Sequence, residues 1–493
     1  MKILLVYPEY PATFWSFKYA LKFVHKKSNL PPLGILTVAA LLPQDWEMQL
    51  VDMNVDKLRD SQIAWADLVM VSAMNIQQDS AVKVIERSHE LGKPVACGGP
   101  LFSTEPEKFD QADYLLLYEG ETCIPQFVRD WQEGHPRHIY NEQSFPRLTE
   151  TPIPRWDLLD AKKYAMLSLQ FSRGCPFNCD FCNVVSLFGH SPRTKSVPQV
   201  LSELDAIYVR GWRGGVFFVD DNFIGNKKLL KREVLPAMIE WSQEHDYPFG
   251  FFTEVSINLA DDEELMDLMV KAGFDNVFVG IETVDEDCLV ECNKSQNEKR
   301  DLTACVHTIQ HHGMQVQGGF ILGFDNDKPT IFNRMFEFIQ QSGVVTAMVG
   351  LLTAPPGTKL FERLKGEGRI VDEFSGVNTS TDMNFVPKMD EKQLMHGYTS
   401  VVHGIYSPKQ YYQRVRTFLE HYKPAGLHKS RLTFTDVKAF LKACWLLGVV
   451  SKGRTHYWGL LHWTRKNKPE LFGRAVAFSI YGYHFRKCLP EMQ

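Results

Sequence analysis

Three cysteines stand close together near the middle of this 493-residue chain, in a pattern that suits a metal centre. The stretch Ser172-Arg-Gly-Cys-Pro-Phe-Asn-Cys-Asp-Phe-Cys182 places Cys175, Cys179 and Cys182 at the spacing C-x3-C-x2-C. Thiolates are soft ligands that select iron–sulfur clusters or zinc. A structural zinc site wants four ligands, usually in two separated pairs, and the chain has no second C-x2-C pair. The spacing therefore favours an iron–sulfur cluster over zinc and over three unrelated cysteines in a loop.

The same stretch resembles the cluster-binding motif of the radical S-adenosylmethionine (radical SAM) enzymes. Phe181 is the aromatic residue that this family places before its last cysteine. The resemblance implies a [4Fe-4S] cluster held by Cys175, Cys179 and Cys182. The remaining iron would then bind the amino and carboxylate groups of SAM.

Six β-strand patterns, separated by helical patterns, begin just before the cysteines and predict a partial (β/α)6 barrel over residues 161–370. Functional residues of parallel barrels lie at the carboxyl ends of the strands, where the cysteine stretch also falls. The predicted strands are Met166–Phe171, Gly215–Val219, Phe249–Val255, Asn276–Ile281, Gln315–Leu322 and Ala347–Leu352.

Polar residues follow most of these strands, and SAM needs both hydrogen-bond acceptors and donors around its zwitterionic methionine end. The resemblance implies that the second strand ends at the SAM amino group and that the fifth strand contacts adenine. Taken singly, each carboxylate could as well be a surface charge or a helix N-cap. Their joint placement favours a SAM site that comprises Phe181, Asp220, Asp221, Asn222, Glu254, Ser256, Glu282, Gly319 and Ile321.

The first 135 residues alternate short apolar runs with helical patterns such as Ser80–Leu91, which predicts a Rossmann-like, doubly wound α/β domain. In such a domain ligands bind beyond the carboxyl ends of the strands. There is no G-x-G-x-x-G and no P-loop, so a dinucleotide or ATP site lacks support. The predicted strands are Lys2–Tyr7, Met48–Asp52, Asp67–Ser72, Pro94–Cys97 and Tyr114–Leu117.

A doubly wound domain ahead of a radical SAM motif resembles the cobalamin-binding domain of the B12-dependent radical SAM proteins. The D-x-H-x-x-G motif of many corrinoid domains is absent, because His25 and His89 have neither the Asp nor the Gly in place. The resembling subgroup commonly lacks this histidine and binds the corrinoid base-off. The alternative is a domain without cofactor that only shapes the substrate cavity. We expect cobalamin at strand ends that carry Asp52, Asn54, Met74, Gln77, Gly98, Gly99 and Glu119.

Residues 136–160 are rich in Pro, Arg and Glu and predict an extended linker, whereas residues 371–493 predict a mainly helical region. The helical region interleaves basic and aromatic residues, which indicates either a cap packed on the barrel, the favoured interpretation, or a helix on a membrane surface. Over essentially the whole chain the sequence resembles the subgroup that contains the hopanoid C-2 methylases. The basic residues of the helical region are Lys429, Arg431, Lys438, Lys442, Lys452, Arg454, Arg465, Lys466 and Lys468, and the aromatic residues between them are Phe434, Trp445, Tyr457, Trp458 and Trp463.

The composition predicts a cytoplasmic protein, with peripheral attachment to a membrane surface as a second possibility. Ten cysteines in a chain of this length, three of them grouped, argue for a reducing compartment. No apolar run reaches the ~18–20 residues that cross a bilayer. The net charge of −5 gives no overall attraction to nucleic acid, which is not expected as a partner.

The resemblance implies an enzyme that cleaves SAM reductively to a 5′-deoxyadenosyl radical and methylates an unactivated carbon with cobalamin. The aromatic C-terminal region suits a hydrophobic, lipid-like substrate, and the reductive step requires an electron donor such as flavodoxin or ferredoxin. Three alternatives are open: a radical SAM enzyme that does not methylate, an enzyme that modifies tRNA or peptides, and a carrier without catalysis.

Overall fold

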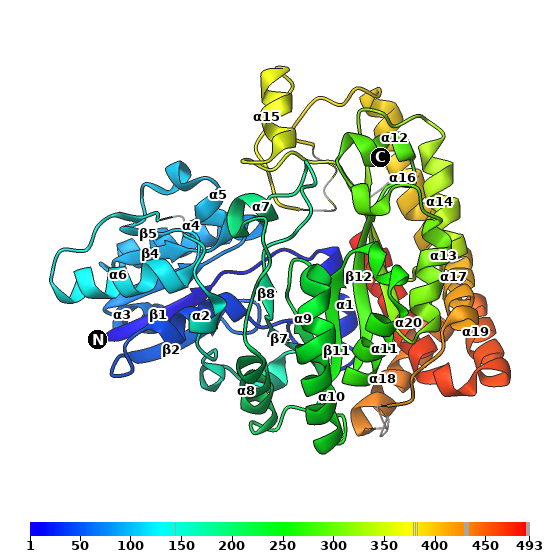
Figure 1. Cartoon of the computed structure of the whole chain (residues 1–493), viewed down its shortest axis with the longest axis horizontal. Coiled ribbons are helices and arrows are strands. Elements are labelled where there is room, and N and C mark those ends of the chain that lie inside the picture. Colours follow the sequence, from blue (N-terminus) through cyan, green and yellow to red (C-terminus); the bar gives the residue numbers. More distant parts are fainter. Residues whose placement is uncertain (143, 378, 380, 382, 428–432, 490–493) are drawn as a thin grey trace.

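Two parallel β-sheets and a group of helices follow one another along the chain (Figure 1). The computed structural model describes residues 1–142, 144–377, 379, 381, 383–427 and 433–489. The first sheet lies on one side of the molecule, the second occupies its centre, and the C-terminal helices cover the far side. No helix in these residues is both long and apolar enough to span a membrane.

The first sheet has six parallel strands in the order β2-β1-β3-β4-β5-β6. Its strands are β1 (Lys2–Tyr7), β2 (Glu47–Asp52), β3 (Leu68–Ser72), β4 (Val95–Gly98), β5 (Tyr114–Leu116) and β6 (Ile139–Tyr140). The helices between them are α2 (Leu33–Leu41), α3 (Asp60–Trp65), α4 (Gln78–Glu90), α5 (Pro100–Thr104) and α6 (Gly120–Gln132).

Both faces of this sheet are buried, as strand β1 illustrates. Leu4 and Val6 belong to a core that includes side chains of α3 and α4, whereas Ile3 and Leu5 belong to a second core with α2 and α6. Successive side chains of a strand point to opposite faces, so a continuous apolar run needs helices on both. The doubly wound fold predicted for this domain is confirmed.

The second sheet is an open barrel of six parallel strands in the order β14-β13-β12-β11-β10-β7. Its strands are β7 (Met166–Leu169), β10 (Gly215–Phe218), β11 (Gly250–Val255), β12 (Phe274–Glu282), β13 (Gln315–Leu322) and β14 (Ala347–Leu351). The main covering helices are α8 (Val197–Tyr208), α10 (Leu235–Glu244), α11 (Glu263–Ala272), α12 (Glu286–Glu291), α13 (Leu302–His311), α14 (Ile331–Ser342) and α15 (Lys359–Gly366). The predicted partial barrel is confirmed.

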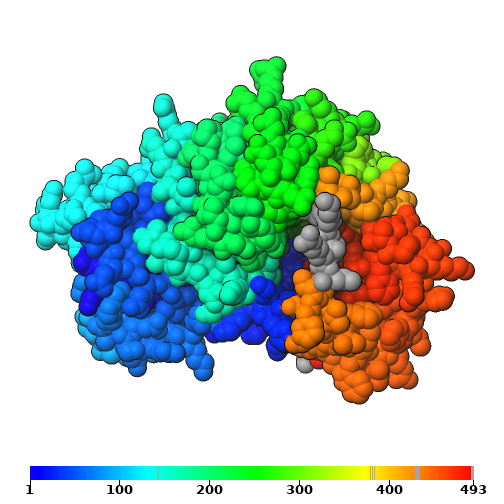
Figure 2. All heavy atoms as spheres, turned by 90° about the horizontal axis from the view of Figure 1, so that it is seen from below, coloured from blue at the N-terminus to red at the C-terminus, as the bar shows by residue number. Residues whose placement is uncertain are grey.

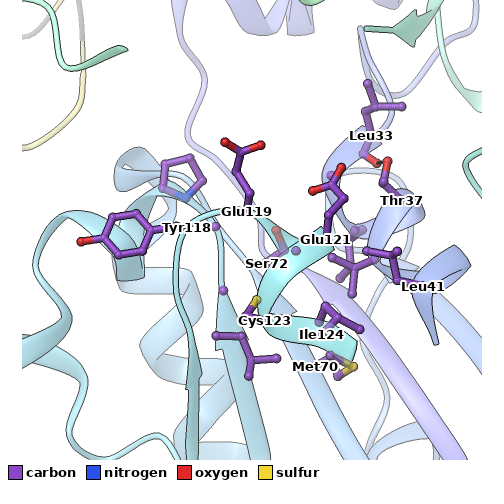
Figure 3. A pocket seen from close by; sticks show the side chains of 18 of the residues that line it. Leu33, Thr37, Leu41, Met70, Ser72, Tyr118, Glu119, Glu121, Cys123 and Ile124 are labelled. Atoms are coloured by element: carbon purple, nitrogen blue, oxygen red, sulfur yellow. Dashed lines mark hydrogen bonds between the residues drawn. The ribbon is translucent and has the colours of Figure 1, made fainter. Parts of the chain in front are cut away.

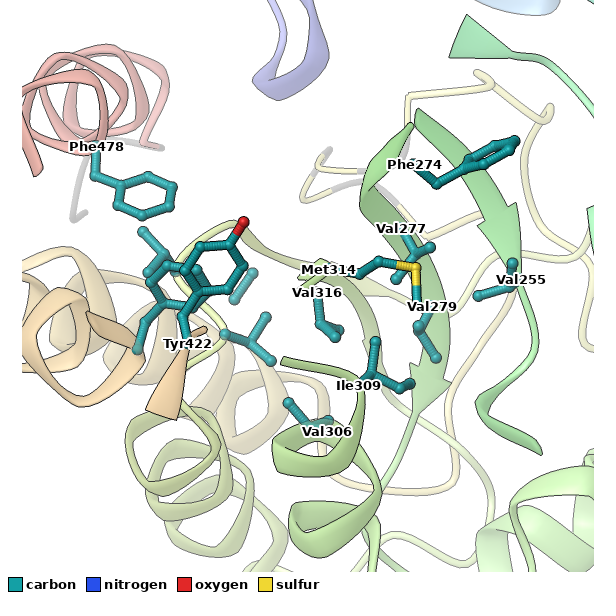
Figure 4. Close-up of a cluster of buried hydrophobic side chains, with 14 of the residues drawn as sticks. Val255, Phe274, Val277, Val279, Val306, Ile309, Met314, Val316, Tyr422 and Phe478 are labelled. Carbon is teal, nitrogen blue, oxygen red and sulfur yellow. The ribbon is translucent and has the colours of Figure 1, made fainter. Parts of the chain in front are cut away.

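The outer face of the barrel forms the main hydrophobic core. Figure 4 shows Val277 and Val279 of β12 and Val316 of β13 facing Ile309 and Val306 of α13. These positions alternate with side chains that point inward, such as Phe278 of β12, which is only partly buried. The outer face therefore holds the barrel together and leaves the inner side chains available for a site.

The C-terminal region is helical, as predicted, and packs on the barrel. It comprises α16 (Glu391–Tyr406), α17 (Pro408–His421), α18 (Phe434–Trp445), the π-helix Leu446–Val450, α19 (Arg454–Asn467) and α20 (Phe472–Cys488). Arg414 of α17 is fully buried and donates to the backbone oxygen of Ile405 at 2.7 Å and to Gln340 Oε1 at 2.6 Å. This side chain fastens α17 to α16 and to α14.

A segment near the N-terminus leaves the first domain and lies between the barrel and α20, where Figure 1 shows α1 (Lys18–Leu21). The Phe14 ring stacks on Phe485 at 4.2 Å, and His484 contacts the Phe14 carbonyl oxygen at 2.8 Å. Trp15 donates from its indole nitrogen to Met348 Sδ of β14 at 2.9 Å. The sequence patterns gave no sign of this crossing.

Three further strands were not predicted. Strand β6 pairs with β5 and lies inside residues 136–160, so the first sheet extends into the segment that we expected to be a linker. Strands β8 (Ser172–Arg173) and β9 (Arg193–Thr194) form an antiparallel pair on either side of the cysteine loop. Each of these strands has only two residues, too few to give a periodic pattern.

Candidate active site

The cysteine loop runs from β8 to β9 at the carboxyl end of barrel strand β7. It contains Cys175, Cys179 and Cys182, followed by the short helix α7 (Val184–Phe188). Gly174 has φ +92°, and a Cβ there would lie 2.9 Å from the Gly189 carbonyl oxygen. The loop therefore needs glycine where it leaves β8.

Asp220 and Asp221, which follow β10, hold the start of this loop. Asp220 is buried and accepts from the backbone nitrogens of Phe171 and Ser172 and from the Ser172 hydroxyl. Asp221 accepts from the Gly174 nitrogen at 2.8 Å. Burial raises the pKa of Asp220 to about 7 and that of Asp221 to about 6, against these hydrogen bonds.

These contacts bear on the prediction that Asp220 and Asp221 bind the SAM amino group. Three donors of the chain already occupy Asp220, so its carboxylate positions the cysteine loop. Asn222 is engaged as well, because its side chain exchanges hydrogen bonds of 3.3 Å with the backbone nitrogen and hydroxyl of Ser256. The sequence located the end of β10, but the side chains there form hydrogen bonds with the protein instead of facing an open space.

The three cysteines are partly buried and influence one another electrostatically. Burial raises the pKa of Cys182 to about 12 and also raises that of Cys175, while the Lys294 ammonium opposes both shifts. No three His, Cys, Asp or Glu side chains of the described residues converge as ligands of a single metal ion. Three thiolates of a [4Fe-4S] cluster bind three different irons and need not converge on a single ion.

Lys294 is a site residue that the sequence analysis missed. It is buried and donates to Glu282 Oε1 at 2.8 Å, and its ammonium lies 5.9 Å from the centre of the Phe181 ring. Burial lowers the pKa of Lys294, but Glu282 and the thiols of Cys179 and Cys182 outweigh burial and raise it above its ordinary value. Lys294 is therefore a cation beside the cluster loop.

Gly280 makes room for this ion pair. A Cβ at Gly280 would lie 2.4 Å from Glu282 Oε1 and 3.0 Å from Lys294 Nζ. Glu282 itself has φ +63°, at a register shift between β12 and β13. The backbone at the end of β12 is thus shaped around the carboxylate that holds Lys294.

Glu254 of β11 is the remaining carboxylate at the barrel mouth and makes no hydrogen bond or ion pair within the described residues. Burial and the negative charges of Asp221, Asp220 and Glu282 raise its pKa to about 8. A carboxyl group held among other carboxylates without a donor of its own is destabilised unless a ligand supplies one. Of the predicted SAM carboxylates, Glu254 is the one for which neither oxygen has a hydrogen-bond or ion-pair partner within the described residues.

The two predicted adenine contacts on β13 differ. A Cβ at Gly319 would lie 2.8 Å from the Phe278 ring, so this ring covers Gly319 on the inner side. Ile321 is only partly buried and packs in an apolar cluster with Phe181 and Phe324, whose rings are 6.3 Å apart. An adenine would find its apolar surface at Ile321 and Phe181 rather than at Gly319.

A cavity of about 250 Å³ lies between α2, α6 and the carboxyl ends of β3 and β4 of the first domain, and Gln170, Arg173, Phe188 and Val219 line it from the barrel side. Figure 3 shows Leu33, Thr37 and Leu41 of α2 on one side and Cys123 and Ile124 of α6 on the other. The wall is mainly apolar, and the glycines Gly34, Gly98, Gly99 and Gly120 leave room beside it.

Of the residues predicted for cobalamin, Gly98, Gly99 and Glu119 line this cavity. Gly99 has φ +96°, and a Cβ there would lie 2.9 Å from the Ala73 carbonyl oxygen. Met74 is exposed near this strand end.

The other three predicted residues are committed to the protein. Asp52 accepts from the Tyr164 hydroxyl at 2.9 Å and from Asn54, and Asn54 and Gln77 both donate to the Pro8 carbonyl oxygen. Asp52, Asn54 and Gln77 therefore shape the loop after β1 rather than offer free groups to a ligand.

Buried ion pairs connect the cysteine loop to this cavity. Arg173 of β8 donates to Glu119 at 2.6 Å and to Glu121 at 2.9 Å, and Arg193 of β9 donates to Glu119 at 2.5 Å. Burial alone would raise the pKa of Glu121, but the Arg173 guanidinium outweighs it and holds that pKa at about 2. Glu119, predicted as a cobalamin contact, thus serves chiefly to join the two domains.

The cavity fits the flat apolar base of a cobalamin nucleotide tail, because two helices and glycine-rich strand ends enclose it. No histidine is among its lining residues in the described part of the chain.

Comparisons with known families match these regions. Residues 23–128 match the B12 binding domain, residues 169–339 the radical SAM superfamily, and residues 358–493 a domain of unknown function, DUF4070. The third match covers the barrel's last helix and the C-terminal helical region.

Two relatives align over nearly the whole chain. An uncharacterized methyltransferase of Synechocystis sp. is 41% identical over 98% of this chain and 91% of its own length. The hopanoid C-2 methylase of Rhodopseudomonas palustris is 32% identical over 93% of this chain and 88% of its own length.

The fold also recurs among solved structures. TsrM of Kitasatospora setae, a radical S-adenosylmethionine methyltransferase with cobalamin and a [4Fe-4S] cluster bound, has a TM-score of 0.63 at 14% identity. The alignment covers 95% of this chain and 99% of that one. Together with the two relatives, the domain matches confirm the resemblance found in the sequence: the chain belongs to the cobalamin-dependent radical SAM methyltransferases.

Proposed function

We propose that this methyltransferase acts on an unactivated carbon of a hydrophobic, lipid-like substrate held inside the barrel. When bound, the cofactors supply the hydrogen-abstracting 5′-deoxyadenosyl radical and the methyl group, and the protein supplies placement and exclusion of water. The sequence similarity to a hopanoid C-2 methylase supports a substrate of this class.

The observation that carries the proposal is the aromatic inner wall of the barrel. Phe217 of β10 and Phe252 of β11 stack at 4.6 Å, and Trp15 meets Phe278 edge-on at 5.5 Å. Met348 lies beside Trp15. These inward-facing side chains are only partly buried, whereas their outward-facing neighbours fill the core. Such a wall favours a large apolar molecule over a charged one.

Within this proposal each polar residue of the mouth has a role. Cys175, Cys179 and Cys182 hold the cluster, and Asp220 and Asp221 fix the loop that carries them. Lys294 is positioned to donate to the SAM carboxylate, and Glu254 to accept from a SAM amino or hydroxyl group. Reductive cleavage of SAM consumes one electron, so the proposal includes a donor such as flavodoxin or ferredoxin.

Labelling with methyl-labelled SAM tests the proposal. The reconstituted holoenzyme is incubated without oxygen, with a reductant, and with either the apolar or the aqueous extract of source cells. We expect label in an apolar product together with 5′-deoxyadenosine, and a matching loss of methylated lipids in a deletion strain. Label confined to aqueous metabolites, RNA or peptides would overturn the substrate class but leave the methyltransferase assignment intact.

A further inference from the structure

An exposed apolar stripe runs along α18 and the π-helix that follows it. Figure 2 shows this part of the chain, in orange, at the surface of the molecule. Seven of the sixteen exposed large apolar side chains of the described residues lie within residues 434–458. Their exposures range from 45% to 75%. The stripe consists of Phe434, Val437, Leu441, Trp445, Val449, Val450 and Trp458.

The spacing places most of these side chains on one side of α18. Phe434, Val437, Leu441 and Trp445 are three or four residues apart, which aligns them along a helix. Trp458 of α19 joins them, because its indole nitrogen donates to the Gly448 carbonyl oxygen at 3.0 Å.

The opposite side of α18 already attaches the helix to the protein. Ala439, Ala443 and, one turn on, Leu447 are buried in the main core, where Phe440 also meets Phe472 of α20. The stripe is therefore a second apolar face that the fold does not use. Exposed apolar patches of this kind mark interaction sites.

The charge around the stripe is strongly positive although the whole chain carries −5. Residues 433–468 contain seven Lys or Arg and a single acidic residue, Asp436. Asp436 accepts from the Thr433 nitrogen and hydroxyl and thereby caps α18. Lys438, Lys452 and Arg454 are exposed and close in sequence to the apolar side chains, whereas Lys442 donates to the Lys22 carbonyl oxygen at 2.9 Å. Lys429 and Arg431, which the sequence analysis grouped with them, lie outside the described residues.

Aromatic and aliphatic side chains on one face, with cations beside them, are the features of a helix that lies in the interface of an anionic bilayer. We propose that this stripe docks the enzyme on an anionic membrane surface, with α18 parallel to the plane of the lipid headgroups. The inserted side chains would be the stripe itself, and the flanking Lys and Arg would contact lipid phosphates.

The place of the stripe suits access to the barrel from a membrane. In Figure 1, α18 lies at the end of the molecule where the barrel strands begin, opposite α12 and α15. A cavity of about 500 Å³ opens at this end between Gly215, Gly250 and Asn276. Arg474 of α20 reaches Asp275, which lines the same cavity, at 3.3 Å. A lipid-like molecule leaving the bilayer would meet this opening rather than the cluster side.

Vesicle co-sedimentation of the full-length protein tests the docking without any catalytic step, so its result is independent of the proposed substrate. We expect binding to phosphatidylcholine vesicles that contain phosphatidylglycerol, weak binding to phosphatidylcholine alone, and a decrease at raised ionic strength. Leu441→Glu/Trp445→Glu should weaken binding at least about tenfold, since two inserted apolar side chains are lost.

Two matched controls separate the stripe from general effects. Val290→Glu alters an apolar side chain on α12, at the other end of the molecule, and should bind as the wild type does; Val290 is 63% exposed, close to the 61% of Leu441 and the 62% of Trp445. Lys438→Gln/Lys452→Gln should weaken binding to anionic vesicles about tenfold, whereas Lys328→Gln, exposed beyond β13, should not. Quenching of tryptophan fluorescence by brominated lipid measures insertion into the bilayer. The quenching that is lost in Trp445→Phe, whose stripe is otherwise unaltered, comes from Trp445.

Three results would overturn the proposal. The first is absence of wild-type binding to anionic vesicles. The second is binding that survives Leu441→Glu/Trp445→Glu in a variant with native circular dichroism. The third is a wild-type dimer in light scattering that this variant abolishes together with all lipid effects, which would assign the stripe to a second copy of the chain.

Discussion

Arg173 donates from Nη1 to Glu119 Oε2 at 2.6 Å, across the boundary between the barrel and the first domain. Arg173 stands two residues before Cys175, and Glu119 is the residue that precedes α6 beside the apolar cavity. One buried ion pair thus fixes the base of the cysteine loop relative to the cobalamin-type cavity. Chemistry that combines two cofactors depends on such fixed placement, because misplacement by about 1 Å can cost roughly 100-fold in rate.

Arg173→Gln is expected to loosen the two domains. It leaves Glu119 and Glu121 buried with fewer partners, which costs about 3–5 kcal/mol when one member of a buried pair is removed. Urea unfolding and limited proteolysis between the domains measure the effect. Arg155→Gln is the control, because its pair with Asp157 is exposed and should contribute less than about 1 kcal/mol.

Adding Glu121→Gln to Arg173→Gln should restore part of the lost stability, since one uncompensated charge is removed. Equal stability of the Arg173 and Arg155 variants would show that the ion pairs do not hold the domains together.

Cys179→Ala should abolish stable cluster assembly, because each thiolate binds a different iron. Anaerobic reconstitution followed by iron and sulfide analysis and by electron paramagnetic resonance of the reduced protein measures this. Cys292→Ala is the matched control: Cys292 is buried near Cys179, but its thiol donates to the Leu289 carbonyl oxygen. A fully loaded cluster in the Cys179 variant would refute the ligand assignment.

Lys294→Gln should weaken SAM binding at least about tenfold while the cluster is retained, because a charge-assisted hydrogen bond to the SAM carboxylate is worth about 1.5–3 kcal/mol. Equilibrium dialysis of the reconstituted enzyme gives the affinity. Lys299→Gln, an exposed lysine five residues further on, should bind SAM normally. Unchanged affinity in the Lys294 variant would mean that this lysine only neutralises Glu282.

The fold was accessible from the sequence because it depends on local periodicity. Apolar runs and helical patterns located all the longer strands, and the cysteine spacing located the cluster loop. Strand β6 has two residues and the crossing of Trp15 depends on contacts with β12 and β14, so neither leaves a local pattern. The sequence showed that the C-terminal region is basic and aromatic. It did not show which face of α18 is buried, because that depends on the packing of α18 on α20.

The sequence located the site at the carboxyl ends of the barrel strands, but it did not predict the contacts that the side chains make there. Sequence position shows that Asp220, Asp221, Glu254 and Glu282 face the barrel mouth, but not which donors each carboxylate meets. Those donors come from β8 and the residues on either side of it for the two aspartates, and from the loop after α12 for Glu282. Lys294 belongs to that loop, far from any strand end in sequence, so no signal identified it.

Glu254→Gln should stabilise the SAM-free enzyme at pH 8 and weaken its SAM binding. The native pKa of Glu254 is raised from 4.5 to about 8. Below pH 4.5 both native and unfolded states hold the proton, and the substitution is neutral. Between pH 4.5 and 8 the unfolded state releases the proton first, so the wild type loses stability as pH rises. The advantage of the variant therefore grows over this window and levels off above pH 8.

A shift of this size corresponds to at most a few kcal/mol, on the order of 3, for a side chain that is only partly buried. Thermal unfolding at pH 5 and pH 8 measures the advantage, with Glu263→Gln on the exposed first turn of α11 as the control. SAM carries a positive sulfonium and hydrogen-bond donors, which favour the ionised carboxylate, so wild-type affinity should rise towards pH 8. That pH dependence should vanish in Glu254→Gln. A stability gain of the variant that does not change with pH, together with a wild-type SAM affinity that stays the same between pH 5 and pH 8, would show that Glu254 is already paired in the free enzyme and does not bind SAM.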